Sequence, residues 1–452
     1  MSVVASPSVN IIRSFPGPRG LPIFGSGLEF WRNPLQFLEN VSEQFGDVVR
    51  YRLGPREAIL FRHPEHVKTV LLTQQHCFVK GGAALWFKSF AGQGLFTSEG
   101  AYHARQRRLS QPAFKQQSMK AYAPVMVDEA MRLRERWHDG CVMNMSSEMT
   151  SLAMRIVSKA VFNVSVEEET SEVGEALTTI MHLFRDFASA RRFLRLVTPW
   201  SRWRFEKARR RLDATIYRMI NERKVDAARR QDLLSRLICA TDEDGQRMAD
   251  EQLRDEVVTI FIAGHETSAN GLAWTWYLLT QHPEIESRLN SEIDHVLGNR
   301  PPTVEDLPKL QYVERVVSES LRLYPPLWII GRRAIVDVMI DDYRIPSGTL
   351  VLLSPYLTQR DQRFFENPAR FDPDRWIPEL KNSRPSFSFF PFGGGGRRCM
   401  GEPFAWIEGV LVVAAIAQKW KMRLVPDQVV QAQPLATLRP KYGLHMTLER
   451  RN

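Results

Sequence analysis

Cysteine is scarce in this sequence: four residues in 452, at positions 77, 141, 239 and 399, and no two of them form a CxxC pair. Zinc ribbons and iron–sulfur clusters need clustered cysteines, and disulfide frameworks belong to short secreted chains. The scatter therefore argues against these classes and favours a reducing, cytoplasmic setting. Cys77, Cys141 and Cys239 are each expected to be a small buried hydrophobic residue.

Long uncharged apolar runs are also missing. The first apolar stretches are interrupted by Ser6, Pro7, Ser8 and Asn10, which makes them too polar for a signal peptide or a membrane span. We therefore expect a flexible N-terminus at residues 1–15, no transmembrane anchor, and a soluble monomer.

The sequence contains no basic repeat, zinc finger or RNA-reading motif, so its net charge of +10 does not indicate binding to nucleic acid. An acidic protein partner or an anionic surface fits the basic balance better. A generally basic, solvated surface remains the alternative, because net charge informs association and not fold.

No internal repeat or low-complexity linker divides the chain, although 452 residues exceed the usual length of one domain. Helical periodicity dominates residues 102–295, and clear helices are predicted at residues 34–45, 250–282, 310–323 and 402–420. Short strands are predicted at residues 48–53, 57–61, 331–334, 338–340, 350–353 and 444–448. The chain is therefore predicted to be a single domain, residues 1–452, that is mainly α with minor β.

Two glycine-rich segments, residues 81–100 and 385–400, are predicted to be loops. In the first, Trp86, Phe87, Phe90 and Phe96 are expected to turn inward. The second contains four successive glycines, residues 393–396, which indicate that the backbone passes close to another group.

A lone cysteine, Cys399, follows those glycines and precedes a predicted helix. Backbone N–H groups at a helix N-terminus favour a thiolate, and a single thiolate suits the axial position of a haem. A flexible loop beside a buried cysteine is the alternative. Arg397 and Arg398 could meet anionic propionates.

The pattern Phe392-x-x-Gly395-x-Arg397-x-Cys399-x-Gly401 resembles, at every defining position, the haem-binding signature of the cytochrome P450 superfamily. The resemblance implies the P450 fold, with a long central helix over the haem and a small β-rich lobe. It implies haem b as cofactor, Cys399 as the iron ligand, and Arg397, Phe392 and Gly401 beside the cofactor.

The middle of the predicted long helix reads Ala263-Gly-His-Glu-Thr-Ser. Gly264 costs about 1 kcal/mol against alanine inside a helix, and Thr267 can bond back to a carbonyl one turn earlier. A packing notch would explain both residues. The resemblance implies instead that Gly264 makes room for dioxygen while Glu266 and Thr267 relay protons.

Glu319 and Arg322 lie at i and i+3 on a predicted helix, a pair that is usually a weak, solvated surface contact. The resemblance implies a buried network of Glu319, Arg322 and Arg375 with a structural role. His103 and Arg107, at i and i+4, otherwise indicate a solvated basic helix. By resemblance they are candidates for propionate contacts, with Arg332 as another, although relatives often carry tryptophan where His103 stands. His103 as the iron ligand is a rival to Cys399.

The resemblance implies a haem-thiolate monooxygenase that inserts one atom of O2 into a lipophilic substrate such as a terpene, fatty acid, polyketide or steroid. No flavin or ferredoxin domain is present in the sequence, so electrons are expected from a separate ferredoxin or flavodoxin-type protein docking near Arg105 and Arg398. A reductase-independent peroxide rearrangement or isomerisation, and a non-enzymatic haem sensor, remain alternatives.

The substrate pocket is expected to be lined by mostly apolar side chains, each of which could instead be plain core. The candidates are Leu85, Trp86, Phe87, Ile262, Ala263, Leu327, Trp328 and Ile329. Residues 184–204 mix aromatic and arginine side chains, and we expect them to form a lid over the entrance, with contact to anionic lipid as the alternative.

Overall fold

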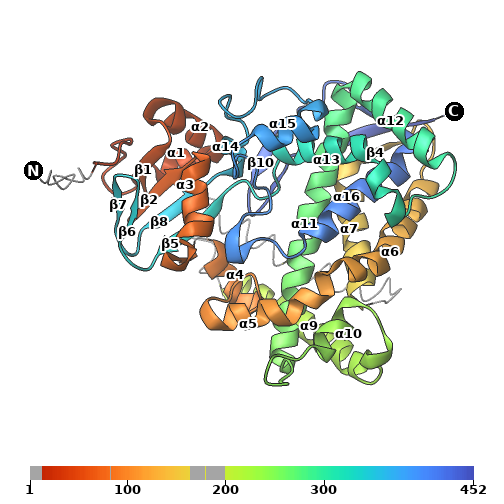
Figure 1. Ribbon diagram of the computed structural model, residues 1–452, viewed down its shortest axis with the longest axis horizontal. Helices are drawn as coiled ribbons and strands as arrows, with labels where there is room; N and C mark the ends of the chain where they lie inside the picture. The colour runs from red at the N-terminus through yellow and green to blue at the C-terminus, as the bar shows by residue number, and fades with distance from the viewer. Residues whose placement is uncertain (1–12, 82, 163–178, 180–198, 452) are drawn as a thin grey trace, which may run out of the picture.

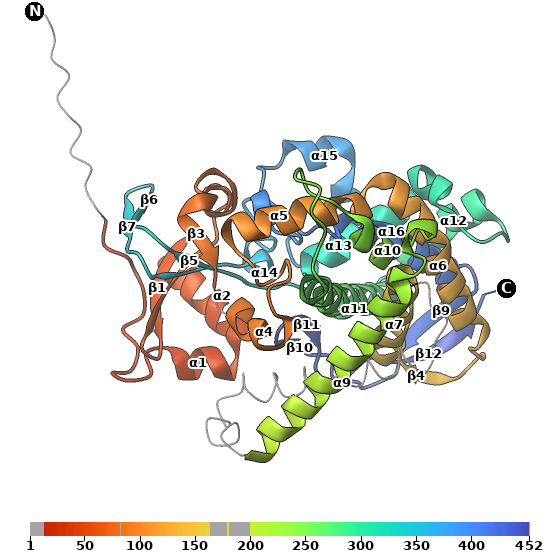
Figure 2. The same ribbon diagram turned by 90° about the horizontal axis from the view of Figure 1, so that it is seen from below.

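The computed structural model describes residues 13–81, 83–162, 179 and 199–451. They form a β-rich lobe and a larger helical part, which lie side by side in Figure 1. Helix α11 (Asp250–Gln281) passes through the centre, and Figure 2 shows it nearly end-on. The mainly α fold with minor β is therefore confirmed.

The β-rich lobe is built on a five-stranded sheet in the order β1-β2-β8-β5-β3. Strands β2 and β8 pair in parallel and the other neighbours are antiparallel. The strands are β1 (Val48–Leu53), β2 (Arg56–Phe61), β3 (Phe78–Lys80), β5 (Ile330–Ala334) and β8 (Leu350–Leu353), with a hairpin of β6 (Val338–Ile340) and β7 (Tyr343–Ile345). Helices α1 (Gly27–Arg32), α2 (Pro34–Phe45) and α3 (Pro64–Lys68) belong to the same lobe.

Helix α11 holds the helical part together. Asp250 and Glu251 in its first turn complement the helix dipole, and Pro283 begins the next helix. Its 32 residues span about 48 Å at 1.5 Å per residue. The main hydrophobic core surrounds it, packed by α5 (Gly100–Ser110), α6 (Gln116–Glu135), α7 (Met145–Phe162), α9 (Pro199–Lys224), α10 (Leu233–Cys239), α12 (Pro283–Leu297), α13 (Gln311–Leu323) and α16 (Glu402–Ala417).

Smaller elements complete the structure. A three-stranded sheet has the order β4-β12-β9, and β10 pairs with β11. Their bounds are β4 (Val142–Asn144), β9 (Trp420–Leu424), β10 (Ala432–Pro434), β11 (Leu438–Pro440) and β12 (His445–Arg450), and short helices α14 (Pro355–Thr358) and α15 (Pro378–Ser383) lie between β8 and the cysteine loop. Of the helices that the structure describes, none combines the length and the apolar character needed to cross a bilayer.

The loop predicted over residues 81–100 is wrong in its first half, where helix α4 (Ala83–Ala91) forms. The flanking glycines obscured an apolar run that contains no proline. Phe87 and Phe90 are buried as expected, but Phe96 is 38% exposed, so its inward placement is also wrong. The side chains of Leu85 and Trp86 lie outside the described residues.

Residues 13–15, at the end of the N-terminal segment expected to be flexible, contact the β-rich lobe: the Arg13 N–H donates to the Asp342 carbonyl at 2.9 Å, and Phe15 stacks on Tyr343 at 5.1 Å between ring centroids. One further prediction needs correction. Cys239 is exposed at the end of α10, not buried. The expected lid, residues 184–204, lies outside the described residues except for its last few positions.

Candidate active site

The loop before α16 brings Cys399 to the N-terminal end of that helix. The Cys399 N–H donates to the Phe392 carbonyl at 2.9 Å and closes the loop. Gly395 has a φ of +64°, and a Cβ there would lie 1.8 Å from the carbonyl oxygen of Leu71. The glycine run therefore does reflect a close backbone approach, and the group approached is the backbone of Leu71.

The thiol of Cys399 lies among protein atoms that raise its pKa by desolvation. The backbone N–H groups of Gly401 and Glu402, and the charge of Arg107, act in the opposite direction. Cys399 nevertheless has accessible surface. A metal ion bound at this accessible thiol would favour the thiolate.

A cluster of basic side chains surrounds one carboxylate near this loop. Arg397 forms an ion pair with Glu99 at 2.6 Å, and Arg107 donates to the Arg398 carbonyl at 2.8 Å. Burial, together with the charge of nearby Arg397, lowers the pKa of Arg332 to about 10. The structure thus brings Arg107, Arg332 and Arg397 into one neighbourhood, as the sequence predicted.

Two more members of this basic cluster are histidine and lysine. Burial, followed by the charge of Lys80, lowers the pKa of His103 to about 4, so the imidazole is neutral at pH 7 and can donate one N–H. Burial also lowers the pKa of Lys80 to about 7. Sequence reasoning missed Lys80 and Glu99, because nothing in their local pattern separates them from surface charges. With Glu99 as the nearest carboxylate in these interactions, the cluster suits an anionic group.

The hydrogen bond predicted for Thr267, to a carbonyl one turn earlier, is present in the middle of α11. The Thr267 hydroxyl donates to the Ala263 carbonyl at 2.5 Å. Ala263 is exposed although its neighbours on the helix are buried or half-buried, so this part of the helix presents accessible surface. A Cβ on Gly264 would lie 3.0 Å from Val157 in α7. Close packing of α7 therefore accounts for the glycine by itself, and a role for Gly264 toward dioxygen stays a prediction.

The Glu266 carboxylate bonds to Thr437, which lies in a segment, residues 435–437, that the sequence placed at the pocket wall but did not pair with Glu266. The Thr437 hydroxyl donates to Glu266 Oε1 at 2.8 Å, and the Asn270 side chain donates to Thr437 Oγ1 at 3.0 Å. Asn270 lies one turn after Glu266, so helix spacing was a usable signal for it. Thr437 lies 171 residues away in sequence, so no local pattern could have indicated it.

A buried carboxyl group, that of Glu408, lies on the other side of this turn of α11. Ser268 donates a hydrogen bond to Glu408 of α16. Burial raises the pKa of Glu408 to about 8, against the lowering effect of Ser268. Glu408 is therefore protonated at neutral pH, and sequence reasoning missed it as well.

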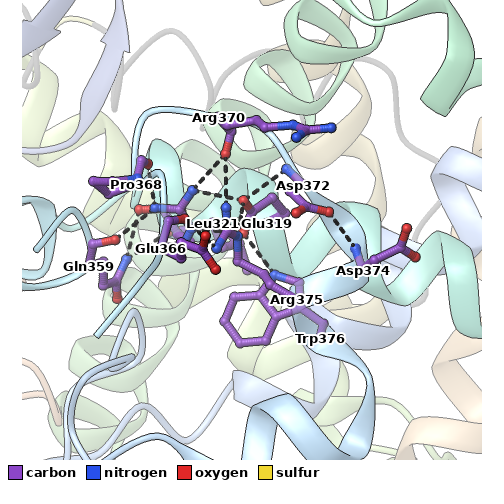
Figure 3. A network of polar contacts seen from close by, with 11 residues as sticks. Glu319, Leu321, Gln359, Glu366, Pro368, Arg370, Asp372, Asp374, Arg375 and Trp376 are labelled. Atoms are coloured by element: carbon purple, nitrogen blue, oxygen red, sulfur yellow. Dashed lines mark hydrogen bonds and ion pairs between the residues drawn. The ribbon is translucent and has the colours of Figure 1, made fainter. Parts of the chain in front are cut away.

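The charged network predicted from Glu319, Arg322 and Arg375 is assembled and buried (Figure 3). Arg322 donates to both Glu319 oxygens at 2.7 and 2.8 Å, and Arg375 donates to Oε1 at 2.8 Å. The Trp376 indole and the Asp372 backbone N–H also donate to Glu319, at 2.9 and 3.0 Å. Arg322 further donates to the carbonyls of Gln359, Pro368 and Arg370. The network thus ties α13 to the segment that leads to the cysteine loop.

The expected pocket walls divide into three groups. Ala263 is exposed, and Ile262, Leu327 and Ile329 are half-buried. Phe87 and Trp328 are 4% and 5% exposed and pack in hydrophobic clusters, so for these two the plain-core alternative fits better. The side chains of Leu85 and Trp86 are not described.

Known proteins share this sequence and fold. The family model described as Cytochrome P450 matches residues 15–446. The chain belongs to the cytochrome P450 family. This P450 is accordingly an oxygen-incorporating oxidoreductase with haem as its cofactor.

Curated relatives match this P450 over nearly its full length. It is 38% identical to pentalenene oxygenase of Streptomyces avermitilis, covering 96% of this chain and 97% of the relative. It is 37% identical to cyclooctatin synthase of Streptomyces melanosporofaciens, covering 97% and 96%. The same organism's cyclooctat-9-en-7-ol 5-monooxygenase is 37% identical, covering 90% and 89%.

Solved structures agree in fold. The cytochrome P450DA haem domain has a TM-score of 0.89 at 27% identity, covering 98% of this chain and 99% of that one. The retinoic-acid-bound cyanobacterial CYP120A1 has a TM-score of 0.87 at 26% identity, covering 96% and 99%.

The residues of this P450 fit a haem. One thiol is accessible, and a cluster with excess positive charge lies close to it, which suits one thiolate ligand for the iron and two anionic propionates. Cys399 would hold the iron, while His103, Arg107, Arg332 and Arg397 would bind or neutralise the propionates. When bound, the haem supplies oxygen activation, and a thiolate ligand favours O–O cleavage.

Proposed function

We propose that this P450 inserts one oxygen atom from O2 into a terpene or terpene alcohol, using two electrons from a separate ferredoxin or flavodoxin-type protein. The observation that carries the proposal is the set of three relatives, matched over at least 89% of each chain, that are named pentalenene oxygenase, cyclooctatin synthase and cyclooctat-9-en-7-ol 5-monooxygenase. The balance is RH + O2 + 2 e⁻ + 2 H⁺ → ROH + H2O.

The chain's own residues contribute ligation, orientation and proton delivery. Cys399 holds the iron, and the buried Glu319 network fixes the segment that precedes its loop. Glu266 and Thr267 would deliver protons, since each lies on or beside the accessible stretch of α11. The half-buried apolar residues Ile262, Leu327 and Ile329 provide walls that suit a hydrocarbon.

An optical titration tests the substrate class. Haem-loaded protein is titrated with sesquiterpenes and diterpenes, including pentalenene, and with a fatty acid, a polyketide lactone and a steroid for comparison. We expect only terpenes to convert the iron from low to high spin. A shift with a fatty acid or steroid and none with any terpene would overturn the substrate class.

Isotope labelling tests the reaction. With a ferredoxin, its reductase and ¹⁸O2, the product of the best terpene should carry one ¹⁸O atom, and Cys399→Ser should give no product and no red-shifted band with carbon monoxide. Product formed from a terpene peroxide without any electron donor would favour the rearrangement alternative. A haem protein that yields no product under either condition would favour the sensor.

A further inference from the structure

One face of α11 forms hydrogen bonds with the turn between β10 and β11. Glu266, Asn270 and Trp274 are spaced by four residues, so they lie above one another on this face. Asn270 and Glu266 bond to Thr437, as described above, and the Trp274 indole N–H donates to the Leu438 carbonyl at 3.0 Å. Three consecutive helical turns therefore bind this β10–β11 turn, residues 435–438.

The β10–β11 turn is also held from its other side. The Trp328 indole N–H donates to the Leu435 carbonyl at 2.9 Å, and the Leu438 N–H donates to the Pro326 carbonyl at 2.8 Å. Thr437 is only 6% exposed. The position of its hydroxyl is therefore set by the surrounding structure and does not depend on Glu266.

The hydrogen-bond pattern also sets the direction in which that hydroxyl donates. A threonine hydroxyl has one proton to give, and it also accepts. Because the Asn270 amide donates to Thr437 Oγ1, the threonine proton is directed at Glu266 Oε1. The Asn270 side chain, 8% exposed, thus orients the donor.

Among the described residues, Thr437 is the hydrogen-bond partner of the Glu266 side chain. No lysine, arginine or histidine among these residues forms an ion pair with Glu266. Thr267 donates to the Ala263 carbonyl instead of to Glu266. A neutral hydroxyl holds a carboxylate less firmly than a guanidinium does. The Thr437 hydroxyl therefore fixes the position of the Glu266 carboxylate but lets it leave easily. A group that carries protons needs both properties.

We propose that Thr437, aligned by Asn270, is a positioning residue for Glu266 that holds the carboxylate at the start of its movement toward Thr267. The inference rests on the proposed function, since it assigns Glu266 the delivery of protons. Without the Thr437 hydroxyl the carboxylate samples several rotamers, so proton delivery slows and more of the reduced oxygen leaves as hydrogen peroxide.

The two fates of oxygen can be counted separately. Productive turnover follows the balance given above, whereas uncoupled turnover is O2 + 2 e⁻ + 2 H⁺ → H2O2. Both consume two electrons, supplied by the ferredoxin. Product and peroxide per electron pair therefore report proton delivery without depending on the rate of electron transfer.

The test compares three single variants. Thr437→Val keeps the shape of the side chain but removes the hydroxyl, and Thr437→Ser restores it. Thr275→Val is the matched control. Thr275 is a 1% exposed threonine of α11, and its hydroxyl donates to the Gly271 carbonyl at 2.8 Å and not to Glu266. Carbon monoxide spectra and thermal midpoints establish that each protein is folded and loaded with haem.

We expect Thr437→Val to lower product per electron pair by about three- to tenfold, a part of the effect of losing a general acid, with a matching rise in peroxide. Thr437→Ser and Thr275→Val should stay within twofold of the parent, and the dissociation constant of the terpene should not change. Equal coupling in Thr437→Val and the parent, or no recovery in Thr437→Ser, would overturn the proposal.

A crystal structure of the haem-loaded parent and of Thr437→Val provides a readout that needs no substrate. The Glu266 carboxylate should lie against Thr437 in the parent and be displaced or spread over rotamers in the variant. A carboxylate in the same single position in both would contradict the inference. If the parent oxidises no terpene, the proposed function fails, and the crystal structures still decide whether Thr437 positions Glu266.

Discussion

At the scale of single residues, burial decides which groups carry charge. Glu256 on α11 is 0% exposed and accepts a hydrogen bond from the Leu95 N–H at 3.1 Å. Burial raises its pKa to about 8, against the lowering effect of that bond and with a further raising effect of Asp255. Glu256 is therefore a neutral acid at pH 7 that fastens the loop after α4.

Glu256→Gln should flatten the dependence of stability on pH. The folded state keeps the Glu256 proton up to about pH 8, whereas the unfolded chain releases it near the ordinary glutamate pKa of about 4.3. Between these values the folded state binds more protons, so the free energy of unfolding falls as pH rises. Glutamine can still accept from Leu95 and has no such proton.

Urea unfolding at pH 5, 6.5 and 8 measures this effect. We expect the parent to lose about 1–3 kcal/mol more than Glu256→Gln between pH 5 and pH 8. Glu251→Gln, at an exposed position of the same helix, should follow the parent. Parallel curves for the parent and Glu256→Gln would show that position 256 is ionised throughout.

At the scale of elements, a buried charge network and a glycine loop together place the cysteine. Glu319 is 0% exposed and receives hydrogen bonds from two arginines, an indole and a backbone N–H. Such a network adds geometric definition more than stability, because desolvation of its charges offsets their attraction. Removing only one partner destabilises the protein, because it leaves a buried charge without its counter-charge.

Glu319→Gln should destabilise the protein strongly. The change leaves Arg322 and Arg375 buried without a counter-charge, which costs about 3–5 kcal/mol. Chemical unfolding and the fraction of protein that retains haem both measure the loss. Asp337→Asn is the control, because its pair with Arg344 is about half exposed and such pairs contribute at most about 1 kcal/mol. Similar losses in the two variants would refute the structural role of the network.

Gly395→Ala should disturb the cysteine loop more than Gly396→Ala does. Gly395 combines a φ of +64° with a Cβ position 1.8 Å from the Leu71 carbonyl oxygen, whereas a Cβ at Gly396 would lie 3.0 Å from the flexible Gln75 side chain. We expect about 1–3 kcal/mol from the backbone strain alone and a weaker red-shifted band with carbon monoxide. Equal spectra and thermal midpoints would contradict this reading.

Element boundaries followed local signals where these were strong. Helix α2 begins at Pro34 after the capping side chain of Asn33, and α11 ends one residue before its predicted limit, ahead of Pro283. Helix α4 was missed because glycines flank it. Strands such as β3 and β10 were missed because each has only three residues, and β3 also pairs with a strand far away in sequence, β5.

At the scale of the whole molecule, the net charge of +10 favours an acidic electron-transfer partner. Of the arginines expected on the docking face, Arg105 bonds to Asp242 at 2.7 Å, and Arg398 pairs with Glu402 while 59% of its side chain is exposed. Arg108, on the same helix as Arg105, is a further candidate, since its side chain is 59% exposed and its ion pair with Glu243 is long, at 3.7 Å.

Arg108→Glu should slow reduction by an acidic ferredoxin several-fold at low salt, because charge reversal weakens electrostatic steering. The difference should disappear at high ionic strength, where exposed charges are screened. Arg344→Glu, at an exposed position in the β-rich lobe, should have little effect in stopped-flow reduction. An equal effect of both changes would indicate a response to net charge and not to a docking face.

The sequence by itself determined the family, the iron ligand expected at Cys399, and the central helix with Glu266 and Thr267, because these signals are local: glycine spacing, helical period and capping. Only the tertiary structure decided that Thr437 bonds to Glu266, that Glu99 and Lys80 join the basic cluster, and that Glu256 and Glu408 are protonated. Those properties depend on burial and on contacts between distant segments, which no local pattern encodes.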